Sequence, residues 1–203
     1  MVNRMKKGTI WMSLGLLMIV AALLLTGYNI RNEKQAGVKS SEAIEEVYTE
    51  IEVLTEEEVE ENIQLHENYP EMSMPTQYVD GQYYIGTLKI PALGLELPII
   101  DGWDDEKSKI APCRYVGSVY QNDLVIAGHN YKTHFGSLKN LVAGDVVQFT
   151  DMDGHCFQYE VIEMEVLDGT AIEEMITGDW DLTLFTCTYG GRTRMTIRCG
   201  LLP

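Results

Sequence analysis

Basic residues are scarce in this sequence, which has 15 Lys and Arg against 31 Asp and Glu over 203 residues, a formal net charge of −16. A general nucleic-acid binder presents a basic face to the phosphate backbone, so this charge argues against a nucleic-acid partner. Hydrophobic residues make up 45% of the chain and charged residues 23%. These shares are close to globular averages, and they argue against wholesale disorder and against a collagen-like fibre.

Cysteine is also infrequent, and none of the four cysteines belongs to a Cys-x-x-Cys pair. This spacing argues against a cysteine-rich zinc site. We interpret Cys113, Cys156 and Cys199 as small buried hydrophobic residues or incidental thiols. The sequence has no glycine-rich strand-to-helix phosphate loop and no internal repeat. We expect neither a metal nor a cofactor.

The charge that is present is distributed unevenly. Residues 1–39 hold 6 Lys and Arg against 1 acidic residue, residues 41–71 hold 12 Glu and no Lys or Arg, and residues 72–203 hold 18 Asp and Glu against 9 Lys and Arg. We therefore predict a short tip at 1–7, a membrane-spanning segment at 8–30, an acidic stalk or linker at 31–80 and one globular domain at 81–203.

The N-terminal segment Gly8–Ile30 carries no charged residue. About 20 mostly apolar residues suffice to cross a bilayer as a helix. Three cations precede the segment, so the positive-inside rule places the N-terminus in the cytoplasm and the rest of the chain outside the cell membrane. A cleaved signal peptide is the alternative, but the apolar run ends in Leu-Leu-Leu-Thr-Gly-Tyr, a poor cleavage site. We expect an uncleaved signal anchor.

The acidic stalk has apolar residues at near-helical spacing between Ser40 and Glu67. One interpretation is a helix that packs on the globular domain or gates its site. The other is a solvated helical or extended spacer, held off an anionic surface by charge repulsion. We favour the spacer, because so many like charges weaken an isolated helix.

The globular part reads as short β-rich runs separated by turn residues such as Asp80-Gly81 and Gly190-Gly191. The predicted strands are Tyr84–Ile90, Leu97–Ile100, Leu124–Ala127, Val146–Thr150, Cys156–Leu167, Leu182–Thr186 and Arg194–Cys199. Short helices are expected at Phe135–Leu141 and Ala171–Ile176. Many short strands at close spacing predict an all-β barrel or sandwich.

Two chemically active residues stand at the ends of predicted buried strands. Cys187 ends the run Leu-Thr-Leu-Phe-Thr-Cys, and His129 follows Leu-Val-Ile-Ala-Gly. A histidine and a cysteine held at strand ends suit an acid/base and a nucleophile. A metal site formed by His129 and His134 fits no known zinc spacing. His66 and His155 read as surface residues.

A thiolate that attacks a carbonyl also needs a donor for the developing oxyanion. Arg194 begins the strand directly across the Gly-Gly turn from Cys187. Strand alternation places Arg194, Thr196 and Arg198 on one face, and we expect Arg198 to face solvent. Arg192 is expected to be a turn charge.

The Thr-Leu-Phe-Thr-Cys187 segment, with Ala127-Gly-His-Asn130 upstream and Arg194-Met-Thr-Ile-Arg-Cys-Gly200 downstream, resembles the sortases, the cysteine transpeptidases of Gram-positive cell surfaces. The resemblance extends over roughly residues 84–200. It implies an eight-stranded β-barrel with Cys187 as nucleophile, His129 as general acid/base and Arg194 as oxyanion or substrate-orienting residue. Substrate-binding roles are implied for Thr186, Asn130 and Tyr189.

The resemblance further implies a substrate protein with a C-terminal sorting signal of the Leu-Pro-x-Thr-Gly type. Its scissile carbonyl would form a thioacyl enzyme, which an amine from a peptidoglycan precursor or a pilin would resolve. Only seven positions separate Cys187 from Arg194, so Arg192 is an alternative for the arginine role. The residues after the cysteine lack a proline seen in some pilin-type members, which favours a class B- or class D-like enzyme.

Three alternatives stay open on the residues alone. The acidic group Asp101, Asp104, Asp105 and Glu106 is either a calcium-binding loop or, as we favour, a solvated turn, since it lacks an EF-hand pattern. Two other functions are also open: an extracellular cysteine peptidase that hydrolyses cell-surface peptides, and a membrane-tethered β-domain that only binds a partner. The last of these leaves the strand-end pair unexplained.

Overall fold

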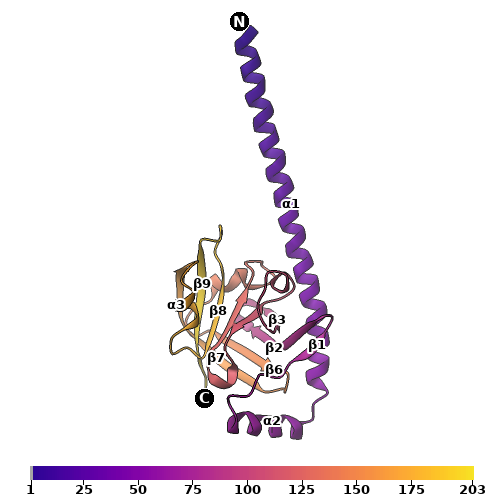
Figure 1. Ribbon diagram of the computed structural model, residues 1–203, viewed down its shortest axis with the longest axis vertical. Helices are drawn as coiled ribbons and strands as arrows, with labels where there is room; N and C mark the ends of the chain where they lie inside the picture. Colours follow the sequence, from indigo (N-terminus) through magenta and orange to yellow (C-terminus); the bar gives the residue numbers. More distant parts are fainter. Residues whose placement is uncertain (1) are drawn as a thin grey trace.

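A computed structural model describes residues 2–203, with side chains from residue 8 onward. A β-barrel stands beside a long N-terminal helix whose first half projects away from it (Figure 1). The helices are α1 (Val2–Glu52), α2 (Glu56–Asn68) and α3 (Ile172–Ile176). The strands are β1 (Gln77–Val79), β2 (Gln82–Ile90), β3 (Leu95–Ile100), β4 (Cys113–Val116), β5 (Leu124–Gly128), β6 (Val146–Asp151), β7 (Cys156–Asp168), β8 (Leu182–Cys187) and β9 (Thr193–Leu201).

The strands form one sheet in the order β1-β2-β3-β4-β5-β8-β9-β7-β6, and an additional β2–β6 pairing closes it. Eight strands, β2 to β9, therefore complete the ring, while β1 is joined to β2 by a tight turn at Asp80-Gly81. Both turn residues have positive φ, +42° and +85°, as two-residue hairpin turns require. The predicted eight-stranded barrel is confirmed. The four-residue strand β4 was not among the predicted strands.

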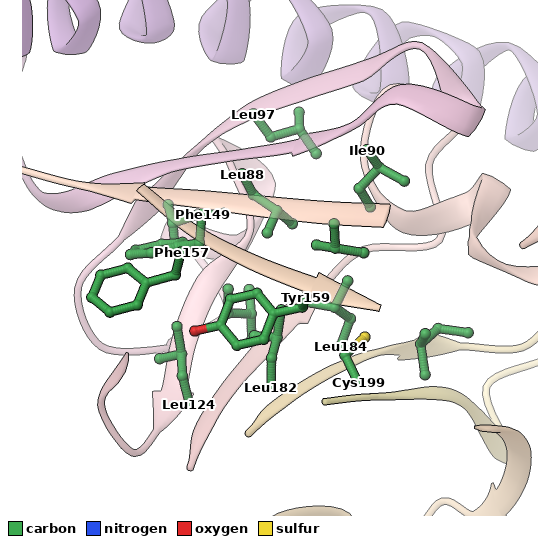
Figure 2. Close-up of a cluster of buried hydrophobic side chains, with 14 of the residues drawn as sticks. Leu88, Ile90, Leu97, Leu124, Phe149, Phe157, Tyr159, Leu182, Leu184 and Cys199 are labelled. Carbon is green, nitrogen blue, oxygen red and sulfur yellow. The ribbon is translucent and has the colours of Figure 1, made fainter. Parts of the chain in front are cut away.

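The interior of the barrel is apolar because its strands alternate between inward and outward side chains. In β6 the side chains alternate between partly exposed and fully buried positions along the strand. Figure 2 shows Leu88, Phe149, Tyr159 and Leu184 converging from four strands. Full burial of one such side chain contributes about 1.5–3 kcal/mol, so this core supplies much of the barrel's stability.

The two short helices of the globular part lie close to their predicted positions. Residues Phe135–Asn140 form a 3-10 helix, η4, and Ile172–Ile176 form α3. Both connect strands of the barrel. Helix α3 packs against β8 and, as described below, forms a wall of the cleft.

The apolar first half of α1 is exposed, and from Gly8 it is long and apolar enough to cross a membrane. It is a candidate membrane anchor, in agreement with the predicted span at 8–30. The helix continues without interruption through the predicted start of the stalk.

The second half of α1 lies along the outside of the barrel beside β1, β2 and β3 (Figure 1). Ala36, Ser40, Ala43 and Val47 are buried, and their spacing defines one helical face. The other, exposed faces of the helix carry the acidic residues Glu42, Glu45, Glu46, Glu50 and Glu52. The expectation of a solvated spacer is therefore wrong for this stretch, because the small apolar face packs on the sheet while the like charges stay in water.

Helix α2 begins after a break at residues 53–55. The Thr55 side chain accepts a hydrogen bond from the Glu58 backbone, and the Glu58 carboxylate accepts one from the Thr55 backbone, which completes a capping box. His66 was expected at the surface, but it is 5% exposed. Its ring stacks on Tyr120 at 3.8 Å, and its Nε2 lies 2.8 Å from Asp153. The second histidine expected at the surface, at position 155, is half-buried.

Candidate active site

Three neighbouring strands bring the predicted functional residues to one end of the barrel. Strands β5 and β8 are parallel, and Gly128 pairs with Thr186. His129 and Cys187, the next residues of the two strands, therefore lie at the same edge of the sheet. Strand β9 runs antiparallel to β8, and there Cys187 pairs with Arg194.

The sequence of β8 explains how the thiol is presented. Residues Leu182–Thr186 are all buried, and Cys187 is the first partly exposed residue of the strand. A rigid buried strand thus holds the thiol at the surface, where a substrate reaches it. Strand β5 repeats this pattern, with four buried residues before the partly exposed Gly128 and His129.

A cleft of about 310 Å³ lies over this end of the three strands, and we call it the β5–β8 cleft. Its polar lining residues are Asp105, Ser108, His129, Thr186, Cys187 and Arg194. Its apolar walls include Trp103, Tyr115, Ile172, Met175 and Phe185. A few polar groups among aromatic and aliphatic walls are typical of a site that binds an extended ligand. A cavity of about 330 Å³ under α2 does not bring a histidine, a cysteine and an arginine together.

Ser108 orients the His129 ring. The Ser108 hydroxyl donates to the Asp105 carbonyl at 3.2 Å, and the same oxygen lies 3.2 Å from His129 Nε2. A hydroxyl has a single hydrogen, so when Ser108 donates to Asp105 it accepts from Nε2–H, and Nδ1 is then the unprotonated nitrogen of the neutral ring. Burial lowers the pKa of His129, and Lys109 lowers it further against the opposing effect of Asp105. The imidazole is therefore neutral at pH 7 and ready to accept a proton.

The Arg194 side chain is held at the turn between β8 and β9. Its Nη1 donates to the Gly191 carbonyl at 2.9 Å and to the Thr193 carbonyl at 3.2 Å. A Cβ at Gly169 would lie 3.1 Å from Nη1 and 2.8 Å from the Arg192 carbonyl. Glycine at this position lets the loop after β7 close against the guanidinium.

The other two arginines of this region lie elsewhere. Arg192 is exposed in the turn and is not among the residues that line the β5–β8 cleft. Arg198 was expected to face solvent but is 2% exposed. It donates to the Glu165 carboxylate, to Thr183 Oγ1 and to the carbonyls of Glu174 and Met175. The strand-face assignment was right, but α3 covers that face, so the solvent prediction is wrong.

Of the three predicted substrate-binding residues, one lines the β5–β8 cleft and two lie outside it. Thr186 lines the cleft and is 4% exposed, and its hydroxyl has no hydrogen-bond partner among the described residues. Asn130 is exposed in the loop after β5, and Tyr189 is fully exposed in the turn after β8. Neither Asn130 nor Tyr189 lines the cleft.

Within residues 2–203, no group of three or more His, Cys, Asp or Glu side chains is arranged to hold a metal ion. In the acidic turn, Asp101 pairs with Arg114, and the Asp104 side chain accepts from the backbone of Glu106 and Lys107. These bonds hold the acidic turn in place. All four cysteines are free, with Cys113 and Cys199 buried and Cys156 exposed.

Several residues of the cleft were missed at the sequence level. Ser108 stands in a charged stretch that we read only as an acidic turn, and nothing local indicates that its hydroxyl reaches a histidine 21 positions away. Trp103 packs edge-on against Tyr115, and Tyr115 packs edge-on against Phe185 with 5.3 Å between the ring centroids. Gly169 follows Asp168 in a dipeptide typical of turns, and this local signal indicates a bend but not a contact with Arg194.

Comparison with known proteins agrees with the family resemblance seen in the sequence. Residues 88–201 match the sortase domain family. Sortase D of Bacillus subtilis (strain 168) is 30% identical over 107 residues, which are 50% of this chain and 53% of the relative. The chain thus spans about half the length of that curated relative.

Solved structures share the fold. Clostridium perfringens sortase C, determined with a C-terminal cell wall sorting motif, superposes with a TM-score of 0.62 at 22% sequence identity. The superposition covers 81% of this chain and 100% of the sortase C chain. The Clostridium perfringens sortase D5 transpeptidase has a TM-score of 0.58 at 21% identity, with 85% and 99% covered. Sortase C1 of Streptococcus agalactiae has a TM-score of 0.63 at 17% identity, with 81% and 99% covered. The chain, whose strands β5, β8 and β9 bring a histidine, a cysteine and an arginine to one cleft, belongs to the sortase family of cysteine transpeptidases.

Proposed function

We propose that this chain is a membrane-anchored transpeptidase that cleaves a C-terminal sorting signal of the Leu-Pro-x-Thr-Gly type and transfers the protein to an amine of the cell wall or of a pilin. The observation that carries the proposal is the alignment of His129, Cys187 and Arg194 across adjacent strands at a single cleft. The relative solved with a sorting motif supports the substrate class.

In the first half-reaction, neutral His129 takes the proton of the Cys187 thiol, and the resulting thiolate attacks the carbonyl carbon of the scissile peptide bond. The C–N bond then breaks, and His129 in its protonated form donates the proton that the leaving amine requires. The product is a thioester between Cys187 and the new C-terminus of the substrate. In the second half-reaction the acceptor amine attacks this thioester, and the C–S bond breaks. His129 takes the proton of the amine and passes it to the departing Cys187 sulfur, which restores the thiol.

Arg194 stabilises the charge that develops on the substrate carbonyl oxygen. An arginine presents five N–H donors in a planar fork, and the two bonds to the turn carbonyls use Nη1. The remaining donors serve the oxyanion or a carbonyl of the sorting signal. Donors fixed before the reaction stabilise a transition state most effectively, because they need no reorganisation.

The position of the candidate anchor supports a location for the reaction at the membrane surface. In Figure 1 the turn between β8 and β9 projects in the same direction as the free first half of α1. If residues 8–30 cross the bilayer with the N-terminus in the cytoplasm, the β5–β8 cleft faces the outer membrane surface. A substrate protein retained in the membrane would then present its sorting signal at the height of the cleft.

The test uses the full-length chain in detergent, incubated with sorting-signal peptides with and without an amine acceptor. Mass spectrometry distinguishes the joined product from the hydrolysed peptide. We expect amine-dependent joining that Cys187→Ala abolishes and that Cys156→Ala, at an exposed thiol outside the cleft, leaves intact. Hydrolysis without joining would favour the peptidase alternative, and no reaction with any peptide would favour a binding domain.

A further inference from the structure

Helix α1 reaches the loop that carries His129. This loop comprises residues 129–134, between β5 and η4. The Glu33 side chain accepts a hydrogen bond from the backbone N–H of Lys132 at 2.8 Å. The Glu33 carbonyl accepts a second bond from the Thr133 hydroxyl at 3.4 Å. One residue of the helix thus holds two consecutive residues of the histidine loop.

Helix and loop also approach each other closely at Gly37. A Cβ at this position would lie 2.8 Å from Thr133 Cγ2 and 3.2 Å from Thr133 Cβ. The first distance is shorter than non-bonded carbon atoms adopt and the second is tight, so any larger residue requires the Thr133 side chain, the loop or the helix to shift. Glycine disfavours a helix interior, and its presence here is explained by the space that the loop requires.

A third contact extends from the helix toward the catalytic ring. His134 is completely buried, and neither of its ring nitrogens has a hydrogen-bond partner among the described residues. The backbones of Ala36 and Ile110 lie near enough to its imidazole to affect its pKa. The Tyr131 ring lies 5.6 Å from the His134 ring and 4.8 Å from the His129 ring, centroid to centroid. Packed rings therefore connect the buried face of α1 to His129.

We propose that the Glu33–Gly37 segment of α1 positions His129, so that the helix of the membrane anchor is part of the active site. Glu33 and Gly37 are positioning residues: they contact the loop and not the reacting atoms. Glu33 follows the end of the uncharged segment by only three residues, or about 4.5 Å of helix. The histidine loop is thereby placed next to the membrane surface. The inference rests on the acid/base role proposed above for His129.

The first test changes the fit between Gly37 and Thr133 in the full-length chain. Gly37→Ala inserts a methyl group against Thr133 Cγ2, and we expect the turnover of thioester formation to fall about 10-fold, with little change in KM for the peptide. Adding Thr133→Ser removes Cγ2 but keeps the hydroxyl that bonds Glu33. The double variant is expected to recover most of the lost turnover.

The second test removes the acceptor of the Lys132 amide. Glu33→Ala is expected to lower turnover and to speed hydrogen exchange of that amide, while Glu33→Gln keeps an oxygen acceptor and preserves both. Glu42→Ala is the matched control, since Glu42 is an exposed residue of the same helix. It is expected to behave as the parent.

A third measurement separates this inference from the proposed function. NMR titration of His129 needs no substrate, and a displaced loop exposes the ring to water, so its pKa should rise toward the ordinary value in Gly37→Ala and return in the double variant. An unchanged titration, with turnover equal to that of the parent, would overturn the positioning role. A parent chain without transpeptidase activity would overturn the proposed function alone, and the titration would still decide whether α1 positions the ring.

Discussion

Cys187 and Arg194 are direct partners across β8 and β9, although seven positions separate them in the chain. The hairpin closes through Gly190 and Gly191, which have φ of +92° and +73°. Glycine adopts this left-handed backbone without steric cost. The short turn fixes the arginine beside the thiol, whereas Arg192 falls on its exposed outer side.

This pairing predicts that Arg194→Lys is severely impaired. A lysine keeps the charge but cannot reproduce the planar fork of donors, and we expect kcat/KM for a sorting-signal peptide to fall about 100-fold. Arg192→Lys is the matched control and should stay within about 2-fold of the parent on the same grounds. Steady-state kinetics of both variants decide the question. Normal turnover in Arg194→Lys with a defect in Arg192→Lys would transfer the role to Arg192.

Ser108 is predicted to orient the general acid/base. In Ser108→Ala the Nε2–H of His129 loses its partner, so the ring samples other orientations and the unproductive tautomer. We expect kcat to fall about 10-fold while KM for the peptide changes little. The pH profile should change with it, because the hydroxyl helps to set the protonation of the ring. Equal profiles in parent and variant would remove Ser108 from the account.

Acidification is predicted to destabilise the fold through His134. Burial lowers the pKa of this imidazole to about 4 from an ordinary value of 6.5. Below pH 6.5 His134 binds a proton in the unfolded chain, whereas the buried imidazole of the folded chain stays neutral until the pH nears 4. The free energy of unfolding therefore falls as the pH falls. From pH 6.5 to pH 5 we expect a loss of about 2 kcal/mol from this residue.

Urea unfolding at several pH values measures this effect. His134→Gln is expected to be less stable at pH 7 but to show a shallower dependence on pH, since the titrating group is gone. The half-buried His129 and His155, whose pKa values burial also lowers, add slopes of the same sign in both proteins. An identical slope in variant and parent would contradict the assignment to His134.

Arg198 is predicted to hold α3 against the barrel. The Arg198 side chain is 2% exposed. Its guanidinium donates hydrogen bonds to two backbone carbonyls at the end of α3, to the Thr183 hydroxyl and to the Glu165 carboxylate. Arg198→Met leaves these acceptors unpaired, and we expect the free energy of unfolding to fall by about 3 kcal/mol. Arg192→Met, at an exposed site, should be neutral. Because Met175 and Ile172 line the cleft, KM for the peptide should also rise in Arg198→Met. A stable variant with parental KM would show that α3 needs no such support.

The strands and the reactive pair were predictable because their signals are local, whereas the closed barrel was implied by the family resemblance, since the strand pattern alone fits a barrel or a sandwich. Strand β5 is a continuous apolar run and β8 is an apolar run with two threonines. A polar residue that directly follows such a run stands at the edge of the sheet. Neighbouring parallel strands then bring His129 and Cys187 together. The Gly190-Gly191 dipeptide predicts a tight turn directly after Cys187, which places Arg194 on the next strand beside it.

The remaining features depend on partners far away in the chain. The apolar face of α1 is visible in the sequence, but its partners Val79, Tyr84 and Ile100 belong to β1, β2 and β3. His66 is buried because Asp153, 87 positions later, meets its ring nitrogen. For Arg198, alternation gives the correct face but does not reveal that α3 covers it.

Intact-mass measurement of the full-length chain, mixed with a sorting-signal peptide in the absence of an acceptor amine, tests the central claim most directly. We predict an adduct equal in mass to the N-terminal fragment of the peptide, mapped to Cys187, discharged by an added amine and absent from Cys187→Ala. An adduct on Cys156, or cleavage that persists in Cys187→Ala, would contradict the assignment of Cys187 as the nucleophile.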